Sequence, residues 1–404
     1  MRLNQKPIGT LVQTATGKKE FFYSKDALHP ISLSMPLCNE VYKDIVCESF
    51  FGGYLPEHPE VKMIIGKKYG ISPNNTFSML KAIGGDCAGA LSFHDPDDVI
   101  DESLTFEITG KEIDAHELER MIDQLKLNPL FLGINNLRLS LAGFQDKAAV
   151  CLWDNKVIIP SPGIPTTHIL KPTHPVLNDL AENEYLIMRI AKQIGINVPE
   201  VILRNDFKKP FLLVTRYDRV IEEGRISRVH QEDFCQALAI SGRYKYQNEG
   251  GPGFNQCYEL INKLYLPAVE KLKFTELVVF NVLIGNMDAH GKNFSILHKP
   301  DHVCLTPFYD LVSTKFYENL SQKMAMKIGK TYKTEELTRI QWEKFSKEIQ
   351  YSFSSLCKLI EKTAEKISLF LDKKDDVVHA GPLVDYLRNH IDKQIKLLYQ
   401  QTRW

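Results

Sequence analysis

The feature that most constrains the fold of this chain is an apolar segment that ends in a glycine and a polar loop. Residues 274–284 are apolar on nearly every face, with Glu276 and Asn281 as exceptions. This pattern predicts a helix that is buried on all sides. Gly285 marks its expected end, since glycine commonly occupies the position just after a helix. The polar loop 286–295 follows this glycine.

Three residues in and after this loop have the types and the spacing that phosphoryl transfer requires. Asp288 and Asn293 are five positions apart, as in protein-kinase catalytic loops, and Asp310 follows in Phe-Tyr-Asp. A carboxylate can accept the proton of an attacking hydroxyl, while an amide oxygen and a second carboxylate can hold Mg²⁺ on the phosphates of ATP. We assign Asp288 as the catalytic base and Asn293 and Asp310 as the metal ligands.

A hairpin is expected between these residues. Short apolar runs at 294–297 and 303–305 are separated by a turn-forming Lys-Pro-Asp. The hairpin would return Asp310 to the side of Asn293, where both could reach one metal ion. His290 is the alternative ligand, but no second His or Cys lies at zinc-ligand spacing, so a zinc site is not expected. An ordinary polar loop is the competing interpretation.

Composition places the chain among globular proteins and limits its partners. Its 404 residues suggest two to three domains, and 50 basic residues balance 50 acidic ones. A neutral chain has no bulk attraction to nucleic acid, so a role on DNA would need a partner or a local patch. Eight scattered cysteines, no signal-peptide pattern and no apolar run of membrane-spanning length predict a cytoplasmic protein without a membrane partner.

Two further segments fit the nucleotide side of a kinase. Residues 167–171 read as a strand that ends in Lys171, and kinases use such a lysine to contact the phosphates while a helix glutamate holds it. The next predicted helix, 181–194, carries Glu182 and Glu184 in its first turn, and we select Glu184 as the partner. Solvated surface charges are the competing interpretation.

The phosphates of ATP need backbone donors, which a loop between two strands can supply. Such a loop follows the predicted strand 137–141 and precedes strands at 148–153 and 156–159. Its residues are Ala142, Gly143, Phe144, Gln145, Asp146 and Lys147. An ordinary hairpin loop is the competing interpretation. Strands at 197–204 and 210–216 complete a small antiparallel sheet, and the backbone of Thr215, Arg216 and Tyr217 is the expected hinge against adenine.

The rest of the chain divides into a mixed N-terminal part and a helical C-terminal part. In the first 93 residues we expect a hairpin at 9–12 and 20–23, a half-buried strand at 29–37 and a helix at 60–69, with a linker at 95–102. From residue 217 the chain is expected to be mostly helical, with helices at 231–239, 256–262, 267–283, 334–353, 356–370 and 385–399.

Eight stretches together resemble the HipA family of bacterial toxin serine/threonine kinases over essentially the whole chain. They are 29–37 (HPISLSMPL), 140–147 (SLAGFQDK), 168–171 (HILK), 183–185 (NEY), 231–236 (QEDFCQ), 245–253 (KYQNEGGPG), 288–295 (DAHGKNFS) and 306–310 (TPFYD). The resemblance implies an α+β fold with a two-lobed kinase core. It also implies a HipA-type N-terminal domain at 1–98, an N-lobe at 99–216 and a helical C-lobe at 217–404.

The resemblance also implies site residues, with ATP and Mg²⁺ as cofactors. ATP contacts are expected from the loop Ala142–Lys147, Lys171, Thr215, Arg216, Tyr217, His290, Gly291, Lys292, Asn293, Tyr309 and Asp310. Ser140 matches the serine that family members autophosphorylate to switch the kinase off; a phosphate dianion there would repel those of ATP. Phe144 is bulkier than the usual residue, and Asp146 replaces a more usual Glu.

Partners follow from the same resemblance. Family members phosphorylate an aminoacyl-tRNA synthetase, best known as glutamyl-tRNA synthetase, which halts translation and growth and promotes persistence. A small helix-turn-helix antitoxin, HipB, neutralises them and carries the kinase on operator DNA. Two alternatives are a small-molecule phosphotransferase of the aminoglycoside-kinase type and a catalytically weak co-repressor that acts with a DNA-binding antitoxin.

Overall fold

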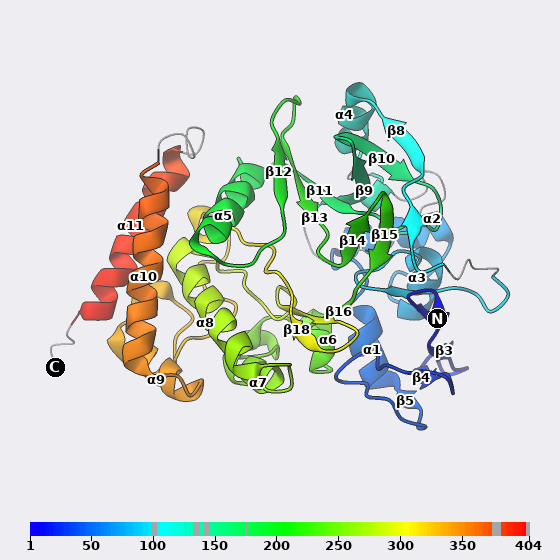
Figure 1. The fold of residues 1–404 in the computed structure, drawn as a ribbon, viewed down its shortest axis with the longest axis horizontal. Helices are drawn as coiled ribbons and strands as arrows, with labels where there is room; N and C mark the ends of the chain where they lie inside the picture. The colour runs from blue at the N-terminus through cyan, green and yellow to red at the C-terminus, as the bar shows by residue number, and fades with distance from the viewer. Residues whose placement is uncertain are drawn as a thin grey trace. The chain divides into compact units, whose positions relative to one another are not determined.

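The structure is a computed structural model that describes residues 1–98, 103–125, 127–131, 138–140, 146–174, 176–373 and 381–400 (Figure 1). The chain forms two compact units. The first consists of Met1–Pro172, Ile202–Arg243 and Ser295–Val303, and the second of Thr173–Val201, Tyr244–Phe294 and Cys304–Trp404. The predicted domain ranges 1–98, 99–216 and 217–404 stay a prediction.

A six-stranded sheet organises the first unit, in the order β12-β13-β11-β9-β10-β8. Its strands are β8 (Gly110–Ile113), β9 (Ala148–Trp153), β10 (Lys156–Pro160), β11 (His168–Pro172), β12 (Val201–Arg204) and β13 (Phe211–Thr215). The predicted turn between β9 and β10 is present: Asp154 and Asn155 have φ angles of 48° and 60°. Two successive left-handed residues match the twist of a two-residue hairpin. Helix α4 (Ala115–Asp123) packs with this sheet in one apolar cluster.

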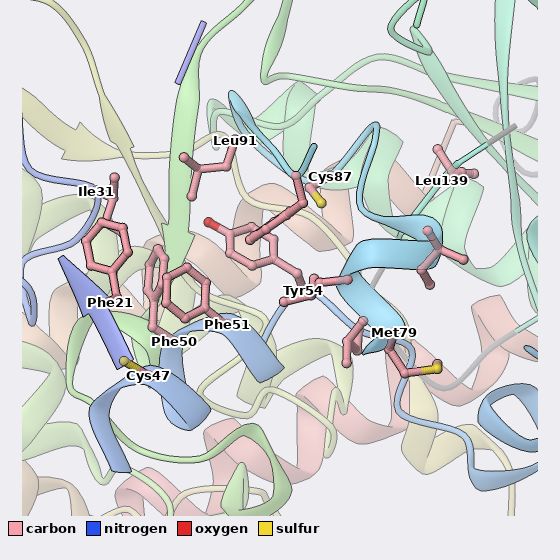
Figure 2. Packing of buried hydrophobic residues seen from close by; sticks show 14 of the residues in the cluster. Phe21, Ile31, Cys47, Phe50, Phe51, Tyr54, Met79, Cys87, Leu91 and Leu139 are labelled. Atoms are coloured by element: carbon pink, nitrogen blue, oxygen red, sulfur yellow. The ribbon is translucent and has the colours of Figure 1, made fainter. Parts of the chain in front are cut away.

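The N-terminal part of the first unit has its own apolar core. The predicted hairpin is β3 (Gly9–Gln13) and β4 (Lys19–Tyr23), which pack with α1 (Asp44–Gly52), α2 (Pro59–Tyr69) and α3 (Thr76–Ile83). The shorter strands are β1 (Arg2–Leu3), β2 (Lys6–Pro7), β5 (Tyr42–Lys43), β6 (Leu91–Ser92) and β7 (Phe106–Glu107). Figure 2 shows the rings of Phe50, Phe51 and Tyr54 gathered in this core, with Leu139 to one side.

The half-buried strand expected at 29–37 is not present. This part of the chain contains only an isolated bridge between Ser32 and Met35. The Ser32 hydroxyl and the Leu33 N–H both donate to the carboxylate of Glu232, 200 and 199 positions away. The alternation of apolar and polar residues was misleading because a distant carboxylate, rather than a neighbouring strand, accepts the Leu33 N–H.

A buried ion cluster joins the N-terminal part to the sheet within the first unit. Asp86 lies 3.3 Å from Arg216, 2.8 Å from Arg219 and 3.6 Å from Arg228. Asp218 lies 3.0 Å from both Arg216 and Arg219. Burial alone would raise the pKa of Asp86, but the three arginines hold it well below its usual range.

The region that follows the sheet is less helical than predicted. Strands β14 (Arg219–Glu222) and β15 (Arg225–Arg228) form a hairpin, and β16 (His230–Asp233) occupies the start of the helix expected at 231–239. Only α6 (Phe234–Ala237) is helical, with Asp233 as its N-cap. β16 instead pairs with β17 (Ser295–His298), and β18 (Val303–Leu305) completes the hairpin expected after the polar loop.

Helices dominate the second unit. They are α5 (Leu180–Ile194), α7 (Phe254–Ile261), α8 (Pro267–Ile284), α9 (Arg339–Glu348), α10 (Phe353–Leu371) and α11 (Gly381–Tyr399). Helices α8, α10 and α11 pack against one another (Figure 1). The single helix expected at 334–353 is divided: a short 3₁₀ turn (Thr334–Glu336) precedes α9, and the left-handed Gln350 separates α9 from α10.

Across the ranges that the structure describes, no helix combines the length and the apolar character needed to span a membrane.

Candidate functional site

The polar loop follows a helix that is buried and ends at a glycine, as its sequence predicted. Helix α8 is buried along its second half and ends at Gly285, whose φ of 74° is left-handed. The Gly285 N–H donates to the carbonyls of Asn281 and Val282, which completes the last turn of the helix. A Cβ at this position would lie 3.0 Å from the Tyr386 hydroxyl. Both the backbone angle and the available space therefore favour glycine at the start of the loop.

Two buried amides hold the predicted catalytic base in place. Asn281 of α8 accepts a 3.0 Å hydrogen bond from the side chain of Asn286, and Asn286 in turn accepts one of 3.1 Å from the Asp288 N–H. The Asp288 side chain itself is 48% exposed. In the sequence, Asn281 stands out only as a polar exception in an apolar helix. That exception was the signal, since a buried amide needs a partner.

Asn293 is oriented by the same loop. Its side-chain Nδ2 donates to the backbone carbonyl of Asp288 at 2.9 Å, and its N–H donates to the carbonyl of His290 at 2.9 Å. Because Nδ2 is the donor, the other end of the amide is Oδ1, an acceptor. Oxygen atoms of this kind are the ligands that Mg²⁺ prefers. Asn293 thus fits the metal position that the sequence predicted.

The returning segment is tied to the loop through Tyr309. Its hydroxyl donates to the carbonyl of Lys292 at 2.8 Å. The next residue, Asp310, has a φ of 57°, in the left-handed region that costs a non-glycine residue about 1 kcal/mol or more. Residues in such conformations concentrate at functional sites. The sharing of one metal by Asn293 and Asp310 stays a prediction.

Helix α5 supports the segment beyond Asp310. Asn183 is buried and makes two hydrogen bonds with the backbone of Ser313: it accepts from the N–H at 2.9 Å and donates to the carbonyl at 3.2 Å. This pair fixes the chain three residues after the predicted metal ligand. No role was predicted for Asn183, although it lies in one of the stretches that carry the family resemblance.

The predicted ligands suit Mg²⁺ bound together with phosphate and water better than a metal ion whose ligands are all protein side chains. Among the described residues, no group of three or more His, Cys, Asp or Glu side chains is placed to hold a metal ion. One amide oxygen and one carboxylate are hard ligands that leave positions for water and phosphate oxygens, as Mg²⁺ sites with nucleotides commonly do. The imidazole Nε2 of His290 lies 4.0 Å from Asp288 Oδ2, beside the carboxylate.

The predicted phosphate-contacting lysine belongs to the first unit. Lys171 lies on β11, between β9 and β13, and is almost fully buried. Its predicted partner Glu184 belongs to α5 of the second unit and is also buried, whereas Glu182 is half-buried. Burial raises the pKa of Glu182. The pairing of Lys171 with Glu184 stays a prediction.

The predicted hinge follows the end of β13, also in the first unit. The Arg216 N–H donates to the carbonyl of Thr167 at 2.9 Å, and its guanidinium belongs to the buried ion cluster. The Tyr217 hydroxyl donates to Gln231, and Thr215 Oγ1 lies 3.1 Å from a ring nitrogen of His168. Contacts of this segment with adenine, which would involve backbone atoms, stay a prediction.

Ser140 is buried in the first unit. Its hydroxyl donates to the carbonyl of Tyr54 at 2.6 Å, and its N–H donates to the carbonyl of Asp86 at 3.2 Å. The preceding Leu139 is part of the N-terminal core. Of the predicted phosphate loop, Ala142, Gly143, Phe144 and Gln145 lie outside the described residues, while Asp146 and Lys147 are half-buried ahead of β9.

Most of the chain matches two known protein-family domains. Residues 139–369 match the HipA-like C-terminal domain, and residues 1–94 match the HipA N-terminal domain. The putative kinase Y4mE of Sinorhizobium fredii is 37% identical over 403 residues, with 97% of this chain and 96% of that protein covered. The serine/threonine-protein kinase toxin HipA of Shewanella oneidensis is 33% identical over 345 residues, with 81% and 78% covered.

A solved structure agrees with these matches. The HipA chain in a complex of Shewanella oneidensis HipA, HipB and operator DNA is 27% identical, with a TM-score of 0.82 over 97% of this chain and 95% of that chain. This similarity confirms the predicted α+β fold with a HipA-type N-terminal domain. The chain belongs to the HipA family of serine/threonine-protein kinase toxins.

Proposed function

We propose that the protein transfers the γ-phosphate of ATP to a serine or threonine of another protein. The observation that carries this proposal is the arrangement of Asp288 and Asn293. The amide of Asn293 turns its nitrogen to the Asp288 backbone, so that Oδ1 serves as an acceptor, while the Asp288 carboxylate stays half-exposed. Phosphoryl transfer depends mainly on positioning and electrostatic stabilisation, to which an exposed carboxylate and a nearby fixed oxygen ligand can both contribute.

Each residue then has a distinct task. Asp288 accepts the proton of the acceptor hydroxyl and orients it for attack in line with the leaving group. Asn293 and Asp310 would hold Mg²⁺, which when bound neutralises charge on the phosphates. Lys171, held by Glu184, would contact the phosphates of ATP, as would the loop Ala142–Lys147. The backbone of Thr215–Tyr217 would bind adenine, with His290, Gly291, Lys292 and Tyr309 as further nucleotide contacts.

The acceptor we propose is an aminoacyl-tRNA synthetase, with glutamyl-tRNA synthetase as the first candidate. Its phosphorylation would stop translation and growth in the cytoplasm and promote persistence. A HipB-like antitoxin is the proposed inhibitor and the main contact with operator DNA. The Shewanella HipA was solved with HipB and DNA, and the balance of 50 basic and 50 acidic residues here agrees with DNA contact through a partner.

Self-inactivation at Ser140 is part of the same proposal. The serine hydroxyl is buried against Tyr54, so the segment must leave this position before a phosphate can be added. A phosphate carries about −1.5 to −2 charges, and burying it without partners would be costly. Phosphorylation of Ser140 would therefore hold this segment, and the phosphate loop that follows it, away from their place in the fold.

The direct test is mass spectrometry of the purified, dephosphorylated protein after incubation with ATP and Mg²⁺, alone and with purified glutamyl-tRNA synthetase. We expect phosphate on Ser140 and on a serine or threonine of the synthetase, and neither modification with Asp288→Ala. Transfer to aminoglycosides, but to no protein, would instead favour a small-molecule phosphotransferase. A co-repressor would be favoured if the folded protein phosphorylates neither Ser140 nor the synthetase, and if Asp288→Ala inhibits growth as strongly as the wild type does.

A further inference from the structure

The segment Lys245–Gly253 is one of the stretches that carry the family resemblance, and it lies against the proposed catalytic loop. The Tyr246 hydroxyl donates a hydrogen bond to Oδ1 of Asp288. The Gly291 N–H donates to the carbonyl of Lys245 at 3.2 Å. The ring of Tyr246 packs edge-to-face on His290, with centroids 5.2 Å apart and planes at 87°. One side chain of the segment thus reaches the carboxylate itself.

The glycines of this segment explain how the tyrosine is presented. Gly250 has a φ of 102°, a left-handed angle that favours glycine. A Cβ on Gly251 would lie 2.3 Å from the carbonyl oxygen of Tyr244. The Gly251 N–H donates to the carbonyl of Tyr246 at 2.9 Å and closes the turn. The chain folds back tightly behind Tyr246, which restricts where its ring can point.

A second contact anchors the segment on its other side. The Gln247 N–H donates to the carbonyl of Ala325 at 3.0 Å, and its side-chain Oε1 accepts from the Lys327 N–H at 2.8 Å. Both partners lie on a part of the chain that is buried at Met324, Ala325 and Met326. Tyr246 therefore extends from a backbone that is fixed on two sides.

We propose that Tyr246 is a positioning residue for phosphoryl transfer: its hydroxyl fixes the Asp288 carboxylate through Oδ1 and so presents Oδ2 to the acceptor hydroxyl. This inference rests on the proposed function. A half-exposed aspartate can rotate its carboxylate, and rotation would move the accepting oxygen out of line. A hydrogen bond to a charged group is strong enough to select one orientation. Asn286 and Asn293 already fix the backbone of Asp288, so Tyr246 adds control of the side chain.

Tyr246→Phe tests the proposal because it keeps the ring against His290 and removes only the hydroxyl. The matched control is Tyr258→Phe, which removes a buried hydroxyl bonded to Thr275 at 2.7 Å, away from Asp288. For the full chain we would measure kcat and the KM for ATP in phosphate transfer to dephosphorylated casein, the Kd for ATP, the thermal midpoint, and the phosphorylated sites by peptide mapping.

We expect Tyr246→Phe to lower kcat about 10- to 100-fold. The Kd and KM for ATP should stay within about twofold, because no nucleotide contact is lost. Tyr258→Phe should keep kcat within about threefold even where it lowers the thermal midpoint. Asp288→Ala and Asp288→Ala combined with Tyr246→Phe should have the same residual rate, since the hydroxyl acts through the carboxylate.

Three outcomes would overturn the inference. If the wild-type protein is active and Tyr246→Phe has the same kcat, the hydrogen bond has no effect on phosphate transfer, and the proposed function is unaffected. Phosphate on Tyr246 in the wild type would make its hydroxyl an acceptor rather than a support. A wild-type protein that binds ATP but transfers phosphate neither to casein, to the synthetase nor to Ser140 would remove the proposed function and this inference together.

Discussion

The side-chain amide of Asn293 and the backbone carbonyl of Asp288 are joined by a 2.9 Å hydrogen bond, with Nδ2 as the donor. One contact therefore sets two features of the site. It determines which end of the Asn293 amide is free to meet a cation, and it closes the turn that carries Asp288. The two residues are five positions apart, and the Asn293 side chain reaches back across the loop to that carbonyl.

Asn293→Asp should impair the site although it keeps an oxygen ligand. The new carboxylate cannot donate to the Asp288 carbonyl and would repel it, so the turn should loosen and the metal position should shift. We expect phosphate transfer to fall at least about 30-fold, the equivalent of roughly 2 kcal/mol. A Mg²⁺ titration of the transfer rate would check this. Asn255→Asp, an exposed amide on α7, should leave the rate unchanged, and equal rates for both variants would contradict the assignment.

Asn183→Leu should destabilise the segment after Asp310. The substitution leaves the buried N–H and carbonyl of Ser313 without the Asn183 side chain. Each unsatisfied buried group costs about 1–3 kcal/mol, so we expect a loss of about 2–4 kcal/mol in the free energy of unfolding and a lower kcat. Chemical denaturation and kinase assays would measure both. The exposed Asn178→Leu is the control. An Asn183→Leu variant as stable as the wild type would contradict this role of Asn183.

Leu139→Val should speed the phosphorylation of Ser140. Leu139 packs in the N-terminal core and so helps to keep the next residue buried. Removal of one methylene typically costs about 0.5–1.5 kcal/mol, which would raise the population of the released segment roughly fivefold. A time course by mass spectrometry would measure the rate. In Leu139→Val, the initial rate of phosphate transfer to another protein should not rise. The control is Leu356→Val in the second unit, which should not speed the phosphorylation of Ser140. Faster phosphorylation of Ser140 in both variants would contradict local release of the segment.

The stability of the fold should decrease as the pH falls below about 6.5, in part because of His390. Burial lowers the pKa of His390 to about 4, and its Nε2 donates to the carbonyl of Val282 at 3.0 Å. Between pH 6.5 and 4 the unfolded chain binds a proton that the folded chain does not, so protonation favours unfolding. At pH 5 this difference amounts to about 2 kcal/mol for one such histidine.

Chemical denaturation at pH 7.5 and pH 5.0 would check the effect of His390. His390→Gln can still donate to Val282 but does not titrate, so it should lose about 2 kcal/mol less stability than the wild type over this range. The exposed His116→Gln should behave as the wild type does. His168 and His230, whose pKa values burial lowers to about 4 and about 3, would keep some acid sensitivity in every variant. An unchanged pH dependence in His390→Gln would exclude the assignment.

The parts of the fold that the sequence predicted well have strong local signals. Helix α8 could be predicted because its apolar run ends in Gly285. The β9–β10 turn could be predicted because Asp154 and Asn155 tolerate left-handed angles. The catalytic role proposed for the loop 286–295 rests on residue types and spacing and stays a prediction. In each case the decisive interaction lies within a few positions along the chain.

The parts that were missed depend on residues far apart in sequence. The segment 29–37 alternates like a strand, but the Glu232 carboxylate holds it in a turn. The strand β16 overlaps the start of the helix expected at 231–239, and this was missed because its pairing partner β17 lies more than 60 residues later. No role was predicted for Asn183 and Tyr246 for the same reason. Each forms a hydrogen bond with a segment that is distant in sequence and lies near it only in the folded chain.

The buried cluster around Asp86 bears on how the family's parts can be recombined. Asp86 lies within the stretch that matches the HipA N-terminal domain, whereas Arg216, Arg219 and Arg228 lie within the stretch that matches the C-terminal domain. A kinase fragment without the first 94 residues would keep three interior cations and only Asp218 to balance them. Chimeras between relatives should therefore fold only when the aspartate and its arginines are inherited from the same parent or matched between the two. Asp86 of the N-terminal stretch thus balances charges that the C-terminal stretch contributes to one buried cluster.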